Sequence, residues 1–363
     1  MIYRAIGLMS GSSLDGLDIV FAEILENGGK WSYDIQHAEC MSYPQEWVDK
    51  LKNATSLSAL DYQLLHTAYG HYLGACVNDF IARHHLQFKV AVVASHGHTT
   101  FHLPAQKMTA QLGDGAAIAA VTKLPVVSDL RAMDVACGGQ GAPIVPIGER
   151  LFFSNYPYLL NIGGIANVSI NKDPYIAFDV CPANRVLNML AQESGVEFDE
   201  GGHLARQGQL HSALLEELNA LEYYQQPHPK SLANEFGTDI VYPLIKKYAL
   251  SSSDALHTYT EHIAIQIKQA LQPHAAEFHS EQPILITGGG AFNTYLIERL
   301  TFHLNELNIQ VVVGDPQLVK YKEALIMALI GVLRWREEYN VLSSVTGADR
   351  DSVGGALWMG QEA

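Results

Sequence analysis

The chain has 363 residues, which exceeds one ordinary domain of ~100–200 residues, so two domains are expected. Hydrophobic residues make up 48% of the chain and exclude global disorder. The 38 acidic and 23 basic residues leave a net charge of −15, which repels phosphate backbones and argues against a nucleic-acid-binding protein. Four widely separated cysteines indicate neither a zinc knuckle nor a disulfide framework.

Targeting signals are absent from the sequence pattern. The first residues lack the charged and apolar regions of a secretory signal, and no apolar run reaches the ~18 residues of a membrane span. We therefore expect a cytoplasmic protein that does not bind a membrane.

Strand and helix patterns alternate in the first third of the chain. Two short apolar runs, Tyr3–Leu8 and Leu17–Leu25, flank a turn of glycine and serine and predict a strand, a turn and a strand. Further on, the pattern predicts helices at Leu60–His84 and Ala110–Val121 and strands at Val90–Ser95 and Pro125–Ser128. Such alternation is typical of the α/β class.

The remaining two thirds continue this alternation. Strands are predicted at Tyr158–Ile162, Ala166–Ile170, Tyr175–Phe178, Pro283–Ile286 and Val311–Val313, and helices at Asn184–Glu193, Asp254–Leu271, Asn293–Leu304 and Lys320–Trp335. The segment LLNIGGIANVSI has the same form as AIGLMSGSSLDGLDIVF, namely a strand, a small-residue turn and a strand. This weak internal repeat predicts two domains of one plan with a ligand between them.

The first glycine-rich turn lies between the first two predicted strands. Its small residues let backbone N–H groups face a phosphate, and Asp15 or Asp18 could reach a magnesium ion. An ordinary hairpin turn of Ser, Gly and Asp is the alternative. Neither a Walker A motif nor a GxGxxG motif is present.

Two further glycine clusters follow strands. Gly163–Gly164 come directly after the strand that contains Asn161, and Gly288–Gly290 separate a strand from a helix. Both allow a ligand to approach the backbone closely. The alternatives are a glycine bulge at the former and a tight capped turn at the latter.

Asp179 ends the predicted strand YIAFD. A carboxylate at the carboxyl end of a strand in an α/β sheet is well placed to act as a general base. Capping of the helix that follows is the alternative.

A histidine cluster and a buried arginine complete the candidate residues. His96, His98 and His102 invite a metal interpretation, but without a nearby carboxylate sugar contacts or structural hydrogen bonds are favoured, and no metal ligand is assigned. Arg131 lies between acidic residues and could hold an anionic substrate group or form a structural ion pair. The irregular segment Gly138–Pro143 is expected to be a hinge between the domains.

Taken together, these segments resemble the anhydro-N-acetylmuramic acid kinase family of the sugar kinase, Hsp70 and actin superfamily. The resemblance extends nearly end to end and rests on IGLMSGSSLDGLD, SHGHTTFHLP, VVSDLRAMDVACGGQGAPIVP, LNIGGIANVS, FDVCPAN, ITGGGAFN and KEALIMALIGVL. The order MSGSSLDG, GGQGAPIVP and NIGGIAN is specific in combination.

The resemblance implies a two-domain actin-like ATPase (ribonuclease H-like) fold with an interdomain cleft. We place the N-terminal domain at residues 1–130 with about 340–363, and the C-terminal domain at 131–339. The implied reaction uses ATP and Mg²⁺ to open the anhydro bridge of 1,6-anhydro-N-acetylmuramic acid and to phosphorylate O6, giving N-acetylmuramic acid 6-phosphate in cell-wall sugar recycling. The family also suggests a homodimer.

The family match assigns roles to individual residues. Asp179 falls on the catalytic aspartate and is expected to deprotonate the attacking water, as in an inverting glycosidase. The expected nucleotide-binding residues are Gly11, Ser12, Ser13, Leu14, Asp15, Gly16, Leu17, Asp18, Gly163, Gly164, Gly288, Gly289 and Gly290. The expected sugar-binding residues are His96, Arg131, Asn161 and Glu323, and of these Glu323 lies beside the apolar face of its helix, where it is either solvated or functional.

One departure from the family pattern leaves alternatives open. The loop after the aspartate, usually Thr-Gly-Pro-Gly-Asn, is Val180-Cys181-Pro182-Ala183-Asn184 in this chain. A kinase for another sugar on the same fold is therefore an alternative, as is a catalytically weak nucleotide-binding switch. A metal hydrolase built on the histidine cluster is the most remote alternative.

Overall fold

The computed structural model describes residues 1–11, 14–228, 230–277 and 282–360. The chain forms two compact units: unit 1 comprises Met1–Ser154 and Tyr321–Ala363, and unit 2 comprises Asn155–Lys320. Residues 131–154 and 321–339, which the sequence analysis placed in the C-terminal domain, therefore lie in unit 1. Hydrogen bonds across unit 1 hold them there; Thr346, for example, donates to the Asp134 carboxylate.

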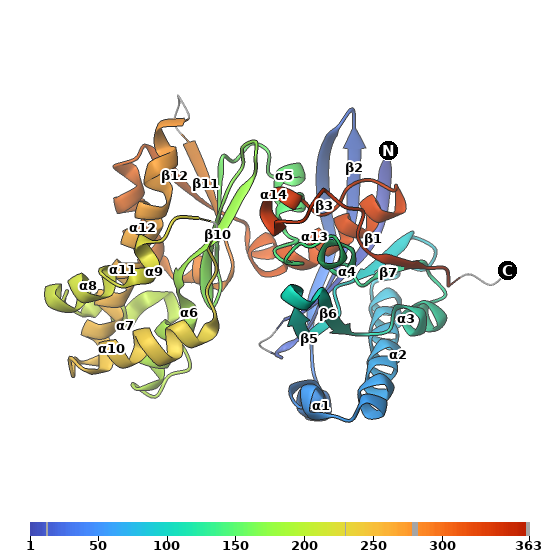
Figure 1. Cartoon of the computed structure of the whole chain (residues 1–363), viewed down its shortest axis with the longest axis horizontal. Coiled ribbons are helices and arrows are strands. Elements are labelled where there is room, and N and C mark those ends of the chain that lie inside the picture. Colours follow the sequence, from blue (N-terminus) through green and yellow to red (C-terminus); the bar gives the residue numbers. More distant parts are fainter. Residues whose placement is uncertain (12–13, 229, 278–281, 361–363) are drawn as a thin grey trace. The chain divides into compact units, whose positions relative to one another are not determined.

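The main sheet of unit 1 has six strands in the order β13-β7-β4-β1-β2-β3. The strands are β1 (Ile2–Ser10), β2 (Gly16–Asn27), β3 (Lys30–Ser42), β4 (Val92–Ser95), β7 (Val126–Ser128) and β13 (Ala356–Trp358). Strands β1, β2 and β3 run antiparallel, β4 and β7 continue parallel to β1, and β13 closes the edge antiparallel. Figure 1 shows the first three strands in blue.

Helices cover this sheet, and a separate hairpin extends from it. The helices are α1 (Gln45–Lys52), α2 (Ala59–Arg83), α3 (Gly115–Thr122), α4 (Ala132–Ala136), α5 (Pro146–Phe152), α13 (Pro316–Trp335) and α14 (Ser343–Thr346), with 3₁₀ turns at Ala54–Ser56 and Pro104–Gln106. The first residues of α13, up to Lys320, belong to unit 2, and the rest of this helix belongs to unit 1. The hairpin consists of β5 (His98–Leu103) and β6 (Met108–Leu112). Helix α13 packs so closely on β1 that a Cβ at Gly7 would lie 1.9 Å from the Ala324 carbonyl oxygen.

The predicted helix Ala110–Val121 is wrong in its first part. Residues up to Leu112 form β6, and the helix α3 begins only at Gly115. The left-handed φ of +114° at Gly113 breaks the chain direction, and the Asp114 carboxylate then caps the helix by accepting from the Ala116 and Ala117 amides. The apolar spacing continues across this break, so periodicity alone could not detect it.

Unit 2 contains a five-stranded sheet in the order β10-β9-β8-β11-β12. The strands are β8 (Tyr158–Ile162), β9 (Ile165–Ile170), β10 (Ile176–Pro182), β11 (Gln282–Thr287) and β12 (Ile309–Val313). The first three run antiparallel, and β11 and β12 are parallel to β8. These five strands agree with the predicted ones to within two residues, except that β10 extends past Asp179 to Pro182.

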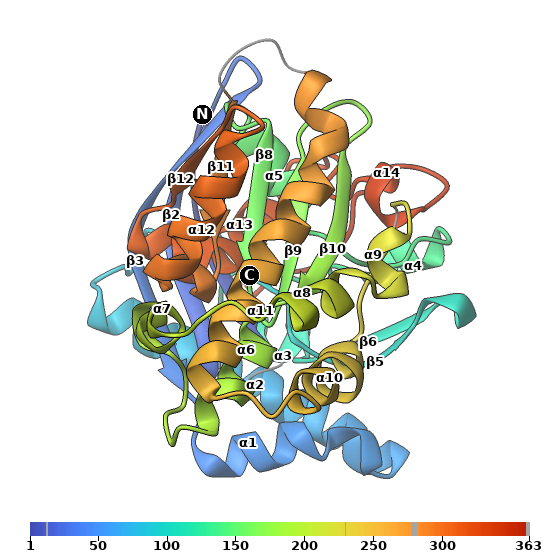
Figure 2. The same ribbon diagram turned by 90° about the vertical axis from the view of Figure 1, so that its left-hand side faces the viewer.

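Helices of unit 2 pack on this sheet around a shared apolar core. They are α6 (Asn184–Gln192), α7 (His203–Gln207), α8 (Ser212–Asn219), α9 (Glu222–Gln225), α10 (Tyr242–Lys246), α11 (Ser252–Leu271) and α12 (Thr294–Asn305). Short turns lie at Glu200–Gly202, Phe236–Val241, Gln272–Glu277 and Gly289–Phe292. Figure 2 shows the long α11 in front of the sheet, and its residues Tyr259, Ile263 and Ile267 are fully buried in the core.

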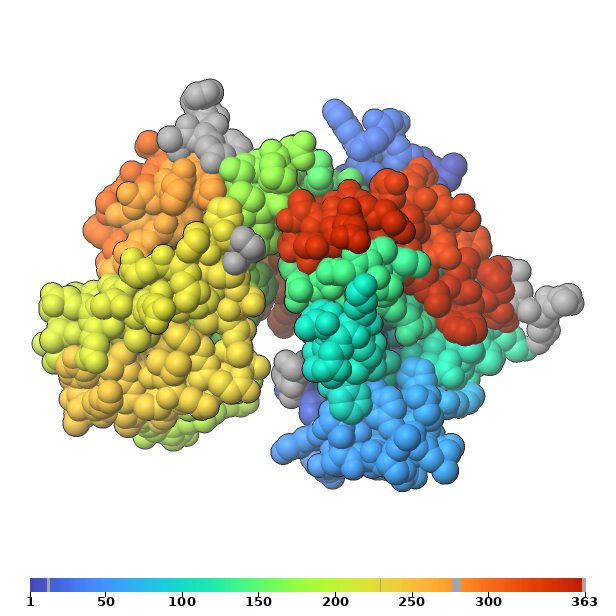
Figure 3. All heavy atoms as spheres, viewed as in Figure 1, coloured from blue at the N-terminus to red at the C-terminus, as the bar shows by residue number. Residues whose placement is uncertain are grey.

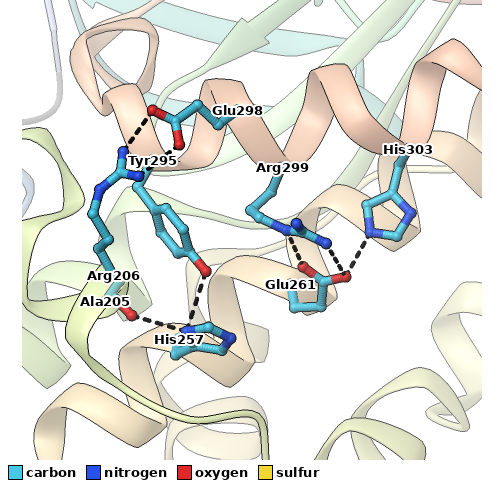
Figure 4. A network of polar contacts seen from close by, with 8 residues as sticks. All are labelled: Ala205, Arg206, His257, Glu261, Tyr295, Glu298, Arg299 and His303. Carbon is cyan, nitrogen blue, oxygen red and sulfur yellow. Dashed lines mark hydrogen bonds and ion pairs between the residues drawn. The ribbon is translucent and has the colours of Figure 1, made fainter.

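A polar network ties α7, α11 and α12 together (Figure 4). The Glu261 carboxylate of α11 accepts from the Arg299 guanidinium at 2.6 and 3.0 Å and contacts the His303 ring at 2.6 Å. Arg206 of α7 pairs through both guanidinium nitrogens with Glu298 of α12. Several of the chain's histidines thus have structural partners outside any candidate site.

Both units use one strand order. Three antiparallel strands are followed by two strands parallel to the first, with β3-β2-β1-β4-β7 in unit 1 and β10-β9-β8-β11-β12 in unit 2. The predicted internal repeat is therefore present as a repeated topology, and the α/β class and the actin-like (ribonuclease H-like) plan are confirmed. Within the described part of the chain, no helix is long and apolar enough to cross a membrane.

Candidate active site

Each unit carries one carboxylate in the same row of its sheet. Met9, Asp18 and Cys40 are paired neighbours across β1, β2 and β3. Asn161, Asn167 and Asp179 form the corresponding row across β8, β9 and β10. Both rows lie one residue before the end of the unit's first strand, directly below the glycine-containing turn that follows it.

Asp18 lies in a half-buried cluster of acidic groups. Burial raises the pKa of Asp18 to about 6; the neighbouring Cys40 thiol lowers this pKa in part, and the charges of Glu323 and Asp15 raise it further. Glu323 is carried to this position by α13, which packs directly on β1. The repulsion between these carboxylates favours a cation or a proton among them.

The donor chemistry of this cluster suits Mg²⁺, which prefers carboxylate oxygens. Among the described residues, no group of three or more His, Cys, Asp or Glu side chains is arranged to hold a metal ion. Magnesium usually takes only one or two carboxylates together with substrate phosphates and water. Asp18 with Glu323 or Asp15 therefore fits magnesium brought in with a nucleotide, whereas the histidine cluster offers no comparable set.

The turn between β1 and β2 contains the predicted phosphate loop. Ser12 and Ser13 lie outside the described residues. Leu14 has a left-handed φ of +61°, a region that bulky residues seldom adopt. The last residues of the segment have a structural role in packing. A Cβ at Gly16 would lie 2.6 Å from the Met41 carbonyl oxygen, and Leu17 is 1% exposed in the core. Among the described residues of the loop, Gly11, Asp15 and Asp18 remain candidates for ligand contact.

His96 orients Arg131. The Arg131 Nε donates to His96 Nε2 at 2.9 Å, so the proton of the neutral ring is on Nδ1, which donates to the Gly97 carbonyl at 2.9 Å. Burial, and then the Arg131 charge, lower the pKa of His96 to about 3 and keep it neutral. Both ring nitrogens are thus used, and His96 acts on a ligand only through Arg131.

Two of the three guanidinium nitrogens of Arg131 have hydrogen-bond partners among the described residues, and the third, Nη2, has none. Its Nη1 donates to the Gly141 carbonyl at 2.6 Å, and no described residue accepts from its Nη2. Burial lowers the pKa of Arg131 to about 10, while Glu323 and Asp134 raise it, so the guanidinium remains charged at neutral pH. No ion pair with Asp129 or Asp134 is present among the described residues, which leaves the charge for an anionic ligand.

Asp134 organises the loop Gly138–Pro143. Its fully buried carboxylate accepts from the Gly141 amide and from the Thr346 hydroxyl, both at 2.7 Å. The Gln140 amide donates to the Thr346 carbonyl. Figure 3 shows residues 340–350 in red at the surface of unit 1 against this green segment. Hydrogen bonds therefore fix the loop that was predicted to be a hinge within unit 1. The chain passes from one unit to the other at Ser154–Asn155 and at Lys320–Tyr321.

In unit 2, Asp179 lies inside β10 rather than at its end. The register shifts between Asp179 and Cys181, so a bulge follows the carboxylate. The cap of α6 is Ala183, and Asp179 is not a helix cap. Its Oδ2 accepts from the Leu232 amide at 2.9 Å, and its carbonyl accepts from the Tyr223 hydroxyl at 2.6 Å. Burial raises the pKa of Asp179, and the Leu232 amide lowers it in part.

A clasp formed by Tyr223, Lys230 and Leu232 holds Asp179. The Asp179 amide donates to the Lys230 carbonyl at 3.2 Å, and the Lys230 ammonium lies 4.6 Å from the centre of the Tyr223 ring. Because Leu232 contacts Asp179 through its main chain, this hydrogen bond does not depend on the side chain at position 232.

The two glycine turns of unit 2 are neighbours. A Cβ at Gly288 would lie 2.7 Å from Asn161 Oδ1, and one at Gly290 would lie 2.2 Å from Ile162 Cγ2. Asn184 bridges them, since its Nδ2 donates to the Ile162 carbonyl and lies 3.6 Å from a Cβ built at Gly289. Gly288 also has a left-handed φ of +80°.

The altered loop after Asp179 is packed rather than open. Val180, Cys181 and Ala183 are at most 2% exposed and belong to the core of unit 2. The Ala183 and Asn184 amides donate to the Gly164 and Gly163 carbonyls, which joins this loop to the first glycine turn. The substituted side chains thus fill core volume.

Several site residues were not foreseen from the sequence. Asp134, Thr346, Tyr223 and the main chain of Leu232 act through contacts between distant segments. Ser10 is bonded to Tyr43 and His98 in the same way. Ser10, His98 and Asp134 lie in segments that the sequence motifs single out, but no spacing rule links any of these residues to its partner in the site.

Comparison with known proteins places nearly the whole chain in one family. The model of the anhydro-N-acetylmuramic acid kinase family matches residues 3–360. A protein of that description from Francisella tularensis subsp. novicida is 33% identical over 94% of this chain and 95% of its own. One from Aliivibrio fischeri is 34% identical over 83% of this chain and 84% of its own, and one from Photobacterium profundum is 30% identical over 98% and 99%.

The matched proteins and the actin-like plan define the class: this chain is a sugar kinase that uses ATP. Within that class, the chain belongs to the anhydro-N-acetylmuramic acid kinase family.

Proposed function

We propose that this enzyme converts 1,6-anhydro-N-acetylmuramic acid, ATP and water into N-acetylmuramic acid 6-phosphate and ADP, a step of cell-wall sugar recycling. The observation that supports the hydrolytic part is the environment of Asp179. Its carboxylate is half-buried, receives one amide hydrogen bond, and has a raised pKa without any acidic neighbour among the causes. Such a group is suited to accept a proton.

In the proposed reaction one bond of the sugar breaks and two new bonds form. A water oxygen attacks C1 while its proton passes to Asp179, and the bond between C1 and the bridging oxygen breaks. The released O6 then attacks the γ-phosphorus of ATP. The bond between the γ-phosphorus and the oxygen that joins it to the β-phosphate breaks, and ADP leaves. Because O6 is both the leaving group at C1 and the phosphoryl acceptor, no separate acid is needed at that oxygen.

Asp18 is assigned a different role from that of Asp179. Asp18 has acidic neighbours, and their mutual repulsion is relieved by a cation. We assign Asp18 and Glu323 to magnesium, directly or through water. When bound with the nucleotide, the ion would neutralise charge on the phosphates during transfer. Gly11 and Asp15 would lie beside the phosphates, with Gly163–Gly164 and Gly288–Gly290 providing open backbone for the nucleotide.

Arg131 is assigned to the anionic lactyl carboxylate of the sugar. Its Nε and Nη1 are taken by His96 and Gly141, which orient the guanidinium and leave Nη2 for a ligand. Asn161 lies beside Gly288 and is assigned to ligand contact in unit 2. The use of ATP leads us to expect a cytoplasmic reaction, and the family resemblance a homodimer, which sedimentation would test.

Incubation with the anhydro sugar and ATP, followed by mass analysis of the product, tests this function. We expect the sugar to gain one phosphate and one water, with no ring opening when ATP is omitted. Phosphorylation of other amino sugars but not of the anhydro sugar would show a different substrate. Tight ATP binding without turnover on any sugar would show a nucleotide-binding switch. The altered loop favours neither alternative, because its side chains lie in the core.

A further inference from the structure

A chain of buried hydroxyl groups in unit 1 ends at His98. The Tyr43 hydroxyl donates to Ser10 Oγ at 2.9 Å and lies 2.6 Å from the Tyr69 hydroxyl. Ser10 Oγ lies 3.2 Å from His98 Nδ1. All four residues are at most 8% exposed. The chain lies directly under the predicted phosphate loop, since Ser10 is the last residue of β1.

The direction of these hydrogen bonds determines where the proton of His98 lies. Tyr43 has given its proton to Ser10, so Tyr43 must accept from Tyr69. Among the described residues, the Ser10 hydroxyl then has one acceptor left, His98 Nδ1. If Nδ1 carried the proton instead, the buried Ser10 hydroxyl would have no acceptor, which costs about 1–3 kcal/mol. The neutral His98 ring therefore carries its proton on Nε2.

The outer nitrogen of His98 has no partner in the described part of the chain. The contrast with His96 is sharp, because both nitrogens of His96 are bonded to Gly97 and Arg131. The two rings are close enough for the charge of His98 to influence His96. His98 thus presents a free N–H donor near Arg131, although the sequence had favoured His96 as the ligand-binding histidine.

We propose that His98 is a substrate-contact residue whose Nε2–H donates to an oxygen of a bound substrate, and that Tyr69, Tyr43 and Ser10 are positioning residues that set its tautomer. This proposal rests on the proposed function and adds a contact to it. The acceptor is a sugar oxygen or a phosphate oxygen of ATP, both of which offer the same chemistry. Burial lowers the pKa of His98, which keeps the ring neutral so that the direction of the chain persists at neutral pH.

Two substitutions of His98 distinguish the role of Nε2 from that of Nδ1. His98→Gln places an amide N–H near the position of Nε2, whereas His98→Asn places an amide near Nδ1 and leaves nothing at Nε2. We expect His98→Asn to raise the KM for one of the two substrates about 10-fold, the loss of one hydrogen bond. His98→Gln should stay within about 3-fold of wild type. The substrate whose KM rises identifies the acceptor. If neither KM changes in His98→Asn, the proposal is overturned.

The tautomer is measured without any assay of activity. Long-range ¹H–¹⁵N spectra distinguish the protonated from the bare ring nitrogen, and we expect protonated Nε2 in the wild-type protein. Ser10→Ala removes the hydroxyl that donates to Nδ1 and should populate the Nδ1–H form. A wild-type ring protonated on Nδ1 would overturn the proposal even if the enzyme is active. An inactive wild-type enzyme with the expected tautomer would instead contradict the proposed function alone.

Discussion

The two units have the same strand order, and each has one carboxylate in the corresponding row of paired residues, but the two carboxylates lie on different strands. In unit 1 the carboxylate is on the middle strand of the antiparallel three, and in unit 2 it is on the outer one. Burial raises the pKa of both Asp18 and Asp179. Their neighbours differ: Asp18 faces other carboxylates, whereas Asp179 faces a main-chain amide. The repeated scaffold therefore supplies a position, and the neighbours decide its chemistry.

The likeness extends to the fourth strand of each unit. Ser95 ends β4 and Thr287 ends β11, and each has a buried hydroxyl for which the structure provides no hydrogen-bond partner. A glycine with a left-handed φ follows each of them, Gly97 at +70° and Gly288 at +80°. The turns beyond these strands then diverge, to the His98 hairpin in unit 1 and to the glycine turn in unit 2.

The largest expected effect comes from the carboxylate of unit 2. Asp179→Asn should lower kcat about 1,000-fold, since a general base contributes about 10²–10⁴. The substituted amide can still accept from Leu232, so the fold should be unchanged by circular dichroism and thermal unfolding. Turnover of the anhydro sugar near the wild-type rate would show that Asp179 is not the base.

Replacing the carboxylate of unit 1 should lower activity but raise the stability of the fold. Asp18→Asn should lower kcat about 100-fold through loss of a magnesium ligand. The folded-state pKa of about 6 lies above that of an unfolded aspartate, so ionising Asp18 lowers the free energy of unfolding as pH rises from about 4 to 6. Removing the charge should therefore raise that free energy by about 1–2 kcal/mol at pH 8 and by little at pH 4.

Urea unfolding at the two pH values measures this effect. Asp15→Asn is the matched control, because it removes the same charge from an exposed position. We expect its free energy of unfolding to change by no more than about 0.5 kcal/mol. An equal stability gain in both variants would show that net charge, and not burial of Asp18, is responsible.

The raised pKa of Asp179 should appear in the pH dependence of the reaction. Below that pKa the carboxylate holds a proton and cannot take one from water. We expect kcat/KM to fall about 10-fold per pH unit on the acid side, beginning at a higher pH than for a free aspartate. A profile that stays flat down to the ordinary aspartate range would contradict the burial of an active base.

The glycine turn of unit 2 offers a matched pair of substitutions. Gly290→Ala would push a Cβ to 2.2 Å from Ile162 and should lower the free energy of unfolding by about 1–3 kcal/mol. Gly289→Ala has 3.6 Å of space and should fold normally. If the nucleotide approaches this backbone, Gly289→Ala should raise the KM for ATP about 10-fold. An unchanged KM would remove Gly289 from the site.

The smallest effect is expected from the clasp on Asp179. Tyr223→Phe removes the hydroxyl that donates to the Asp179 carbonyl and should lower kcat about 3–10-fold with little change in KM. Tyr224→Phe is the control, since its hydroxyl contacts His262 instead. Equal losses in both variants would indicate a general effect on folding rather than positioning of Asp179.

Much of the scaffold could be predicted from local pattern. The apolar runs located the β1–β2 hairpin and the strands of unit 2 to within a few residues, because strand and helix periodicities are local properties. The long strand β3 was missed, since its exposed positions alternate over thirteen residues without an apolar run. The break at Gly113 was missed because apolar spacing continued across it.

The composition, the glycine turns and the family motifs identified the class of enzyme and singled out the two carboxylates as candidates without any coordinates. The roles of their neighbours depended on tertiary contacts. Glu323 reaches Asp18 because α13 packs on β1, and Leu232 reaches Asp179 because residues 230–232 are hydrogen-bonded to that residue of β10. Which of His96 and His98 has a free donor followed from partners at Arg131 and Ser10. Hydrogen-bond direction and burial join segments far apart in the chain, and no local sequence pattern records them.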